Sequence, residues 1–436
     1  MTIMQVVDLF AGAGGLSEGF RQAGFSVIAG SDNDPDAMAT YRTNFPEACA
    51  ITGDIRNPEI KEQILALAKQ ATVIVGGPPC QAFSQVRNHT RVIEDPRNSL
   101  YREFVDVLAR SLPAAFIMEN VTGMDQMGVR EQIVFDLTLH GEYTVTPQIV
   151  DAADFGVPQT RKRLLFIGIK TSLGIAPPLV TGTAATQAVT FARFKGTRRP
   201  RYQVVVQEHI RSILVGNALS NPEDLSVVTA AEAISDLVRL PIGNRNDEIS
   251  FSDLLPPTTA YQRLMRASTG DTLRNVQVPR MNEDTTLRLR GIPPGGNFRD
   301  LRDELLERYI TGQRWGQDNG TGKLSRRHFY AYRRLHPGIW AWTLNTKADS
   351  VYHYSEARAL SVREFARLQS FPDRFVFTAD PRSGPIEGRH DGGPAHSRYR
   401  QAGNAVPPLL ARSVAVELLA ALASARTKER RKAAGG

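Results

Sequence analysis

The stretch DLFAGAGG at residues 8–15 decides the fold, because glycines there join a strand pattern to a helix pattern. An apolar run of strand length precedes the glycines, and the helical pattern that follows ends at Gly24. Such a turn lets a ligand approach the backbone at a helix N-terminus, although an ordinary tight turn would look the same. The third glycine of the dinucleotide-binding fingerprint is replaced by Ser17, which disfavours a nicotinamide cofactor.

The alternation of strand and helix patterns continues through the first 170 residues. Strands are expected at residues 26–29, 72–75, 115–118, 143–150 and 164–169, and helices at residues 35–45, 59–70 and 99–112. Strict alternation predicts an α/β fold with a Rossmann-like, mostly parallel sheet covered by helices on both faces. Ligands of such sheets bind at the carboxyl ends of the strands.

Charge is distributed unevenly along the 436 residues, whose net charge is +8. Residues 1–180 hold 15 basic and 20 acidic side chains, a net charge of −5, whereas the remaining residues hold 38 and 25, a net charge of +13. This division predicts a polyanionic partner that docks on the second half.

Two cysteines are too few for a disulfide framework or a zinc ribbon, so we expect a reducing compartment and a cytoplasmic location. The N-terminus lacks the basic region and cleavage site of a signal peptide, and we expect no membrane-spanning segment.

The alternation stops near residue 180, where Gly, Pro, Arg and Thr become frequent. The expected organisation is a catalytic and cofactor-binding domain in residues 1–180, a smaller irregular domain in residues 181–354, a return to the first domain in residues 355–425, and a flexible basic tail in residues 426–436. Within the third part, the sequence SVRE at residues 361–364 has capping-box spacing and predicts a helix through residue 369. A last helix is expected over residues 409–425.

Three more strand ends carry residues that can do chemistry. In the sequence GGPPCQ, two prolines stiffen the loop and hold Cys80 at a fixed, exposed position, as a nucleophilic thiolate requires. Glu119 directly follows an apolar strand, and Arg161 and Arg163 lie two residues apart, on one face of a strand start. Each charged residue alone could equally form a surface ion pair. A buried, structural cysteine is the better interpretation for Cys49.

Two acidic residues follow the second and third strand patterns. Asp32 stands about 20 residues after the glycine-rich turn, where an acid can bind a ribose diol, and Asp54 follows a short third strand. Two acids without a phosphate-binding lysine favour an adenosine cofactor that lacks phosphates. S-adenosylmethionine fits this description.

In this order and spacing, the motifs resemble the DNA cytosine-5 methyltransferase family of the bacterial restriction-modification type. Three further signatures carry the resemblance: REFARLQ at residues 363–369, FPD at residues 371–373 and QAGNAVPP at residues 401–408. Residues 228–243 also look familial. The family usually has a shorter link than residues 381–395, so that run is interpreted as an insertion.

The resemblance implies a reaction and a role for each catalytic residue. Cys80 would add to carbon 6 of a cytosine that has been flipped out of double-stranded DNA, so that carbon 5 can accept a methyl group. Glu119 would hold ring nitrogen 3 and the exocyclic amine, and Arg163 would bind the base carbonyl oxygen. Arg161 would bind a nearby phosphate or the acid.

The resemblance also implies S-adenosylmethionine as the cofactor and no metal. Phe10 would stack on the adenine, Asp32 would hold the ribose and Asp54 would hold the adenine amine. The same pocket would include Gly12, Gly14, Gly15, Pro78, Leu100 and Asn404.

The implied partners are double-stranded DNA, read by residues 181–354 as a target recognition domain, and a cognate restriction endonuclease that acts on the same site. The enzyme is expected to be a monomer. One alternative is a tRNA methyltransferase of the same fold, but the Cys-Phe-Thr tripeptide of that branch is absent. Another is a non-catalytic DNA-binding relative, which would be expected to have lost the nucleophile, the acid or the cofactor loop. None of these is lost here.

Overall fold

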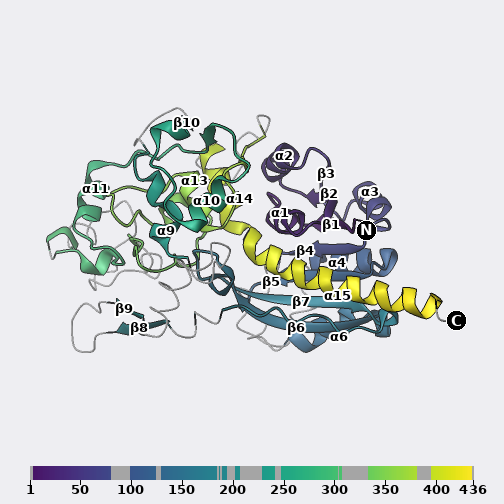
Figure 1. The fold of residues 1–436 in the computed structure, drawn as a ribbon. Coiled ribbons are helices and arrows are strands. Elements are labelled where there is room, and N and C mark those ends of the chain that lie inside the picture. Colours follow the sequence, from purple (N-terminus) through teal and green to yellow (C-terminus); the bar gives the residue numbers. More distant parts are fainter. Residues whose placement is uncertain are drawn as a thin grey trace.

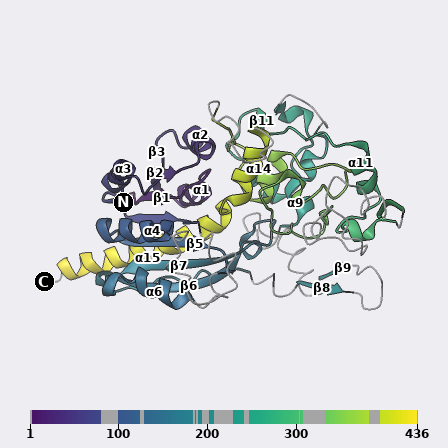
Figure 2. The ribbon, with the colours of Figure 1, turned by 180° about the vertical axis from the view of Figure 1, so that it is seen from behind.

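The chain divides into an α/β part and an irregular part. The computed structural model describes residues 3–79, 99–123, 129–183, 186, 189–193, 202–206, 228–240, 247–302, 304–306, 332–380 and 394–434. In Figure 1 the purple and blue sheet domain lies beside the green irregular part, and helix α14 (Pro394–Asn404) and the start of α15 (Pro408–Ala434) lie between them. The reverse view in Figure 2 shows the same arrangement.

A seven-stranded sheet in the order β3-β2-β1-β4-β5-β7-β6 forms the centre of the α/β part. Its strands are β1 (Gln5–Leu9), β2 (Ser26–Asp32), β3 (Cys49–Thr52), β4 (Val73–Gly76), β5 (Ala115–Asn120), β6 (Tyr143–Asp151) and β7 (Lys162–Lys170). The first five strands pair in parallel, whereas β7 is antiparallel to both β5 and β6. The prediction of a mostly parallel Rossmann-like sheet is confirmed.

Helices cover both faces of the sheet, because successive strand residues point to opposite sides. Val6 belongs to one buried cluster and Val7 to the other. The first cluster includes side chains of α1 (Gly15–Gln22), α2 (Pro35–Asn44) and α15. The second includes side chains of α3 (Pro58–Ala68), α4 (Ser99–Ser111) and α6 (Arg130–Leu137). The sheet is therefore buried on both faces, as the apolar runs in its strands predict.

Helix α15 packs so tightly on α1 that two positions of α1 must be glycine. A Cβ atom on Gly15 would collide with the carbonyl oxygen of Val406, and one on Gly19 would collide with Pro408 and Ala411. The C-terminal segment is thus seated against the helix that follows the glycine-rich turn.

Helix α15 also continues to Ala434. The expected helix end at residue 425 is wrong, because the small and charged residues after it are good helix formers. The flexible basic tail expected for residues 426–436 stays a prediction. By length and composition, one helical stretch, His396–Thr427, could cross a membrane, but 56% of its most apolar window is buried inside the protein. Its packing on α1 is that of a core helix.

The irregular part contains short elements and two small buried clusters of its own. The elements are β8 (Val189–Arg193), β9 (Tyr202–Val206), α9 (Ala230–Ile234), β10 (Glu248–Ser250), α10 (Ala260–Arg266), β11 (Thr272–Arg274) and α11 (Glu283–Arg290). Ala233, Tyr261 and Leu344 nevertheless belong to the main core cluster. Residues 181–354 therefore share part of their core with the sheet domain. The run at residues 381–393 lies outside the described residues.

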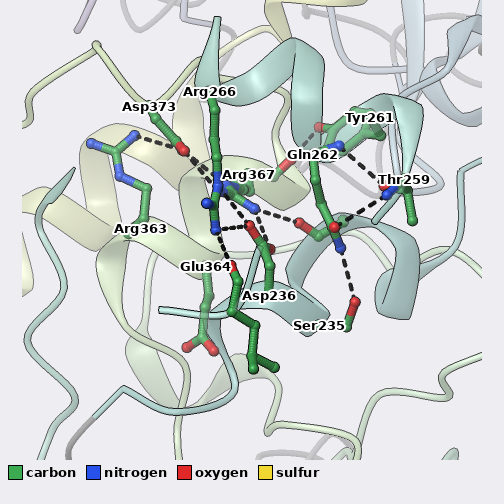
Figure 3. Close-up of polar contacts among 12 residues, drawn as sticks. Ser235, Asp236, Thr259, Tyr261, Gln262, Arg266, Arg363, Glu364, Arg367 and Asp373 are labelled. Carbon is green, nitrogen blue, oxygen red and sulfur yellow. Dashed lines mark hydrogen bonds and ion pairs between the residues drawn. The ribbon is translucent and has the colours of Figure 1, made fainter. Parts of the chain in front are cut away.

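A buried charge network joins the two parts, and Figure 3 shows its polar contacts. It centres on Arg367 of α13 (Val362–Leu368), the helix whose predicted capping box at Ser361 is confirmed. Arg367 donates to both carboxylate oxygens of Asp373, at 2.9 and 2.6 Å, and to Asp236 Oδ1 at 2.6 Å. Arg266 pairs with the other oxygen of Asp236, at 2.5 Å. Burial opposes the charge on Asp373, but Arg367 nonetheless lowers the pKa of this carboxyl below its usual value.

We expect Asp373→Asn to lower the free energy of unfolding by about 3–5 kcal/mol, because it leaves the Arg367 charge buried with one carboxylate fewer. The measurement is urea unfolding followed by circular dichroism. The matched control is Glu62→Gln, which breaks an exposed 2.7 Å pair with Arg110 and should leave the free energy of unfolding nearly unchanged. Equal, small losses in the two variants would contradict a structural role for the network.

Candidate active site

A cavity of about 790 Å³ opens at the carboxyl ends of the parallel strands. Its volume lies in the range of ligand pockets, and its position is the one expected for an open α/β sheet. The predicted site residues in its wall are Phe10, Gly12, Gly15, Asp32, Asp54, Pro78, Leu100, Glu119, Arg161, Arg163 and Asn404. The structure thus brings together residues that are scattered over nearly 400 positions. Cys80 lies outside the described residues, but Pro79, its neighbour in the chain, also lines the cavity.

The glycine-rich turn leaves its backbone open toward the cavity. Phe10 and Gly12 have positive φ angles of 58° and 54°, which turn the chain sharply after β1. A Cβ atom on Gly12 would meet no described atom within 4 Å, so a ligand can approach here. Gly14 has a different role from the predicted one: it caps α1, and a Cβ atom there would lie 2.5 Å from the ring of Phe45.

Asp32 and Asp54 both reach the cavity, as predicted, but in different environments. Asp32 accepts the backbone N–H of Gly12 at 2.9 Å and that of Asp34 at 2.9 Å, while burial raises the pKa of its carboxyl. Asp54 is 37% exposed and pairs with Arg56 at 2.5 Å, and this pair lowers its pKa. One acid is therefore held rigidly by the turn itself, and the other stands at the rim.

An ion pair between Arg400 and Asp34, 2.8 Å long, also forms part of the cavity wall. Sequence reasoning missed both residues. The available signals were the position of Arg400 directly before the QAGN motif and that of Asp34 two residues after Asp32.

Glu119 and Arg163 form an ion pair in the cavity wall, through Oε1 and Nε. Their side chains are only 12% and 11% exposed, so little water screens the pair. Glu119 ends β5, and Arg163 lies in the neighbouring strand β7. The structure therefore places the predicted acid and arginine side by side.

Two residues that sequence reasoning missed tie this pair to the loop that leads to Cys80. A Cβ atom on Gly77 would lie 2.9 Å from Glu119 Oε2, so glycine leaves room for the carboxylate. The Asn120 side chain donates to the carbonyl oxygen of Pro78 at 3.1 Å. The sequence signals were the second glycine of GGPPC and the asparagine directly after Glu119.

Arg161 is buried, and its guanidinium contacts protein carbonyls. It donates to the carbonyl oxygens of Leu344 at 3.2 Å and Gly403 at 2.9 Å. Burial lowers the pKa of this guanidinium, followed in effect by the nearby charge of Arg163. The expected partner of Arg161 was a phosphate or the acid, whereas the described contacts are carbonyls of two segments that meet the start of β7.

Burial acts on two carboxyls at the glycine-rich turn, those of Asp8 and Asp32. Asp8, at the base of the turn, accepts two hydrogen bonds from Ser17 at one oxygen, while its Oδ1 is buried and has no hydrogen-bond partner among the described residues. Burial raises the pKa of Asp8 to about 7. Burial also raises the pKa of Asp32, which lines the cavity and suits a ligand that carries hydroxyl groups.

Comparisons with known proteins agree with this geometry. The family model of the C-5 cytosine-specific DNA methylases matches residues 4–420. Type II methyltransferase M.AgeI of Thalassovita gelatinovora is 30% identical over 96% of this chain and 100% of its own length. Type II methyltransferase M.DdeI of Desulfomicrobium norvegicum is 29% identical over 94% of this chain and 88% of its own.

Solved structures share the fold. A prophage-encoded DNA modification methyltransferase from E. coli superposes with a TM-score of 0.65 at 23% identity, covering 96% of this chain and 99% of its own. The Entamoeba histolytica methyltransferase EhMeth superposes with a TM-score of 0.51 at 13% identity, covering 97% and 99%. Because the family model spans nearly the whole chain and the predicted residues meet in one cavity, this protein belongs to the C-5 cytosine-specific DNA methylase family and is a DNA (cytosine-5) methyltransferase.

Proposed function

We propose that the protein transfers a methyl group from S-adenosylmethionine to carbon 5 of a flipped-out cytosine, in a specific double-stranded DNA sequence, through a covalent bond to Cys80. One observation carries the proposal: the Glu119–Arg163 pair and the loop that leads to Cys80 share a cavity with the open glycine turn and Asp32. Groups for activating a base and groups for holding an adenosine cofactor thus face the same space.

The cavity residues fit S-adenosylmethionine. Asp32 would accept hydrogen bonds from the ribose hydroxyls, Phe10 would stack on the adenine, and Asp54 would accept from the adenine amine. Leu100 and Asn404 would close the pocket around the cofactor. The bound cofactor supplies an electrophilic methyl group.

The protein would activate the cytosine ring in two ways. The Cys80 thiolate forms a bond to carbon 6, which moves an electron pair toward carbon 5 and makes it nucleophilic. Glu119 and Arg163 contact neighbouring atoms of the same base, ring nitrogen 3 with the amine and the carbonyl oxygen. Because they are already side by side, the base meets a preformed set of partners. After methylation, carbon 5 loses its proton, and the bond between sulfur and carbon 6 breaks to restore the thiolate.

A base inside a duplex cannot reach this cavity, so the target nucleotide must leave the stack. We infer that residues 181–354, with 24 basic and 17 acidic side chains, read the DNA sequence and attract its phosphates. The names of the relatives support a role as the modification enzyme of a type II restriction-modification system, with a cognate endonuclease acting on the same site. We also propose that the enzyme acts as a monomer on DNA.

We expect Cys80→Ser to abolish methyl transfer while S-adenosylmethionine still binds, because a hydroxyl is a far weaker nucleophile than a thiolate. Tritium transfer from labelled cofactor to DNA measures turnover, and calorimetry measures cofactor binding. Cys49→Ser is the control, because exposed Cys49 lies in β3 and should be dispensable. The wild-type enzyme should form a covalent adduct with DNA that contains 5-fluorocytosine, and denaturing gels detect this adduct. Turnover by Cys80→Ser would refute the assignment.

Asp32→Asn should weaken S-adenosylmethionine binding by about 10- to 100-fold, because a hydrogen bond to a charged group contributes about 1.5–3 kcal/mol. Calorimetric Kd values for the cofactor and its demethylated product provide the measurement. Glu131→Gln, an exposed acid on α6, controls for the loss of one negative charge. An unchanged Kd in Asp32→Asn would move the cofactor away from the predicted ribose position.

Exchange of residues 181–354 for those of a relative with a known target should transfer the methylated sequence. Within the exchanged region, the chimera retains residues 228–236, 260–266 and 335–351 of this chain, because side chains in these stretches pack in the main core. Bisulfite sequencing of plasmid DNA identifies the target of each enzyme. DNA affinity should also fall steeply with salt, because counterions are released on binding. A folded chimera that methylates the original sequence would place recognition elsewhere.

A further inference from the structure

The Gln159 side chain, two residues before Arg161, is fully buried and joins three segments of the chain. Its Oε1 accepts the backbone N–H of Leu344 at 2.8 Å. Its Nε2 donates to Gln369 Oε1 at 2.9 Å and to the carbonyl oxygen of Leu368 at 3.2 Å. Both ends of the carboxamide are therefore used, and no other uncharged side chain of similar length supplies a donor and an acceptor in this way.

The backbone around Gln159 is paired with the same segment, residues 341–345. Ala341 donates to the carbonyl oxygen of Pro158 at 2.8 Å and accepts the N–H of Thr160 at 2.9 Å. Thr343 adds a side-chain hydrogen bond to the carbonyl oxygen of Thr160 at 2.8 Å. Ala341 thus forms an isolated parallel bridge with Gln159, just before the start of β7.

The contacts around Gln159 extend to Arg163 and to the segment that carries Asn404. Arg161 bonds to the Leu344 carbonyl, and Arg163, two residues further along β7, pairs with Glu119 in the cavity. On the other side, Gln369 Nε2 donates to the carbonyl oxygen of Ala402 at 2.7 Å, close to Asn404 in the cavity wall. A displacement of residues 341–345 would therefore shift Arg163 relative to the cofactor site.

Residues 341–345 lie at the point where the irregular part returns to the sheet domain. We propose that Gln159 is a positioning residue for methyl transfer: its carboxamide fixes this return segment to the strand that carries Arg163, so that the recognition region and the base-binding arginine are placed together. This inference rests on the proposed function. Gln159 does not line the cavity, so it acts through Arg161 and Arg163 rather than on a ligand.

The test compares Gln159→Met with Gln148→Met in the full-length enzyme. Gln148 is a matched control, because its side chain also accepts a backbone N–H and donates to a backbone carbonyl, both of Val180, at 3.0 and 2.7 Å. It lies in the edge strand β6, and it does not line the cavity. The measurements are kcat on methylatable DNA, Kd values for S-adenosylmethionine and DNA, and the thermal midpoint.

We expect kcat of Gln159→Met to fall by about 10- to 100-fold, as small misplacements of catalytic groups do, while both Kd values and the thermal midpoint match those of Gln148→Met. Trapping of the adduct on 5-fluorocytosine DNA should slow by the same factor. Equal kcat values in the two variants would overturn the inference. So would a loss of binding and stability in Gln159→Met that parallels its loss of kcat.

Gln159→Asn serves if the methionine variant does not fold, because it keeps the amide but is too short to reach all three partners. A wild-type kcat in folded Gln159→Asn would overturn the inference, and a reduced kcat with intact binding would support it. The wild-type enzyme shows whether the proposed function has failed or only the positioning role of Gln159. Lack of methyl transfer by the wild type refutes that function, whereas undiminished turnover by Gln159→Met refutes only the positioning role.

Discussion

The buried pairing of Arg367 with Asp236 and Asp373 is the interaction on which the arrangement of the two parts depends. Two carboxylates that are taken out of water need a fixed positive partner, and Arg367 supplies one in a geometry that satisfies both. Asp236 lies near the start of the described irregular part, and Arg367 lies on the helix that begins the return to the sheet domain. Apolar contacts would tolerate sliding between the parts, whereas this pairing permits only one relative placement.

That placement matters because the active site is built from both ends of the chain. Glu119 and Arg163 come from the sheet, and Arg400, Gln401 and residues 404–406 add to the cavity wall. Helix α13, which carries Arg367, also brings Gln369 against Ala402. The network therefore acts on the site indirectly, because Arg367, Asp236 and Asp373 do not line the cavity. Its energetic value lies in fixing one arrangement, since isolated buried ion pairs add little net stability.

The sequence predicted most of what lies at the strand ends and little of what lies between segments. Strand periodicity and glycine turns located β1, β2, β4 and β5, and the residues that follow them meet in one cavity because parallel strands end at the same edge. The partners of Arg161 could not be predicted, because the carbonyls of Leu344 and Gly403 are selected by packing over about 200 residues. In the sequence, Gly12 and Gly14 stand in the same glycine-rich turn and cannot be told apart. Only the position of Phe45 in the structure shows that Gly14 has a steric role. The extension of α15 was missed because small, charged residues fit a helix and a tail equally well.

The close seating of α15 on α1 has a consequence for synthesis of the protein on the ribosome. The face of α1 that Gly15 and Gly19 leave bare is covered by residues 406–411, which are made long after α1. The sheet domain can therefore form its strands early but cannot close its cofactor wall until almost the entire chain has been made. A nascent or truncated chain would lack that wall, so modification of DNA would begin only with completed molecules.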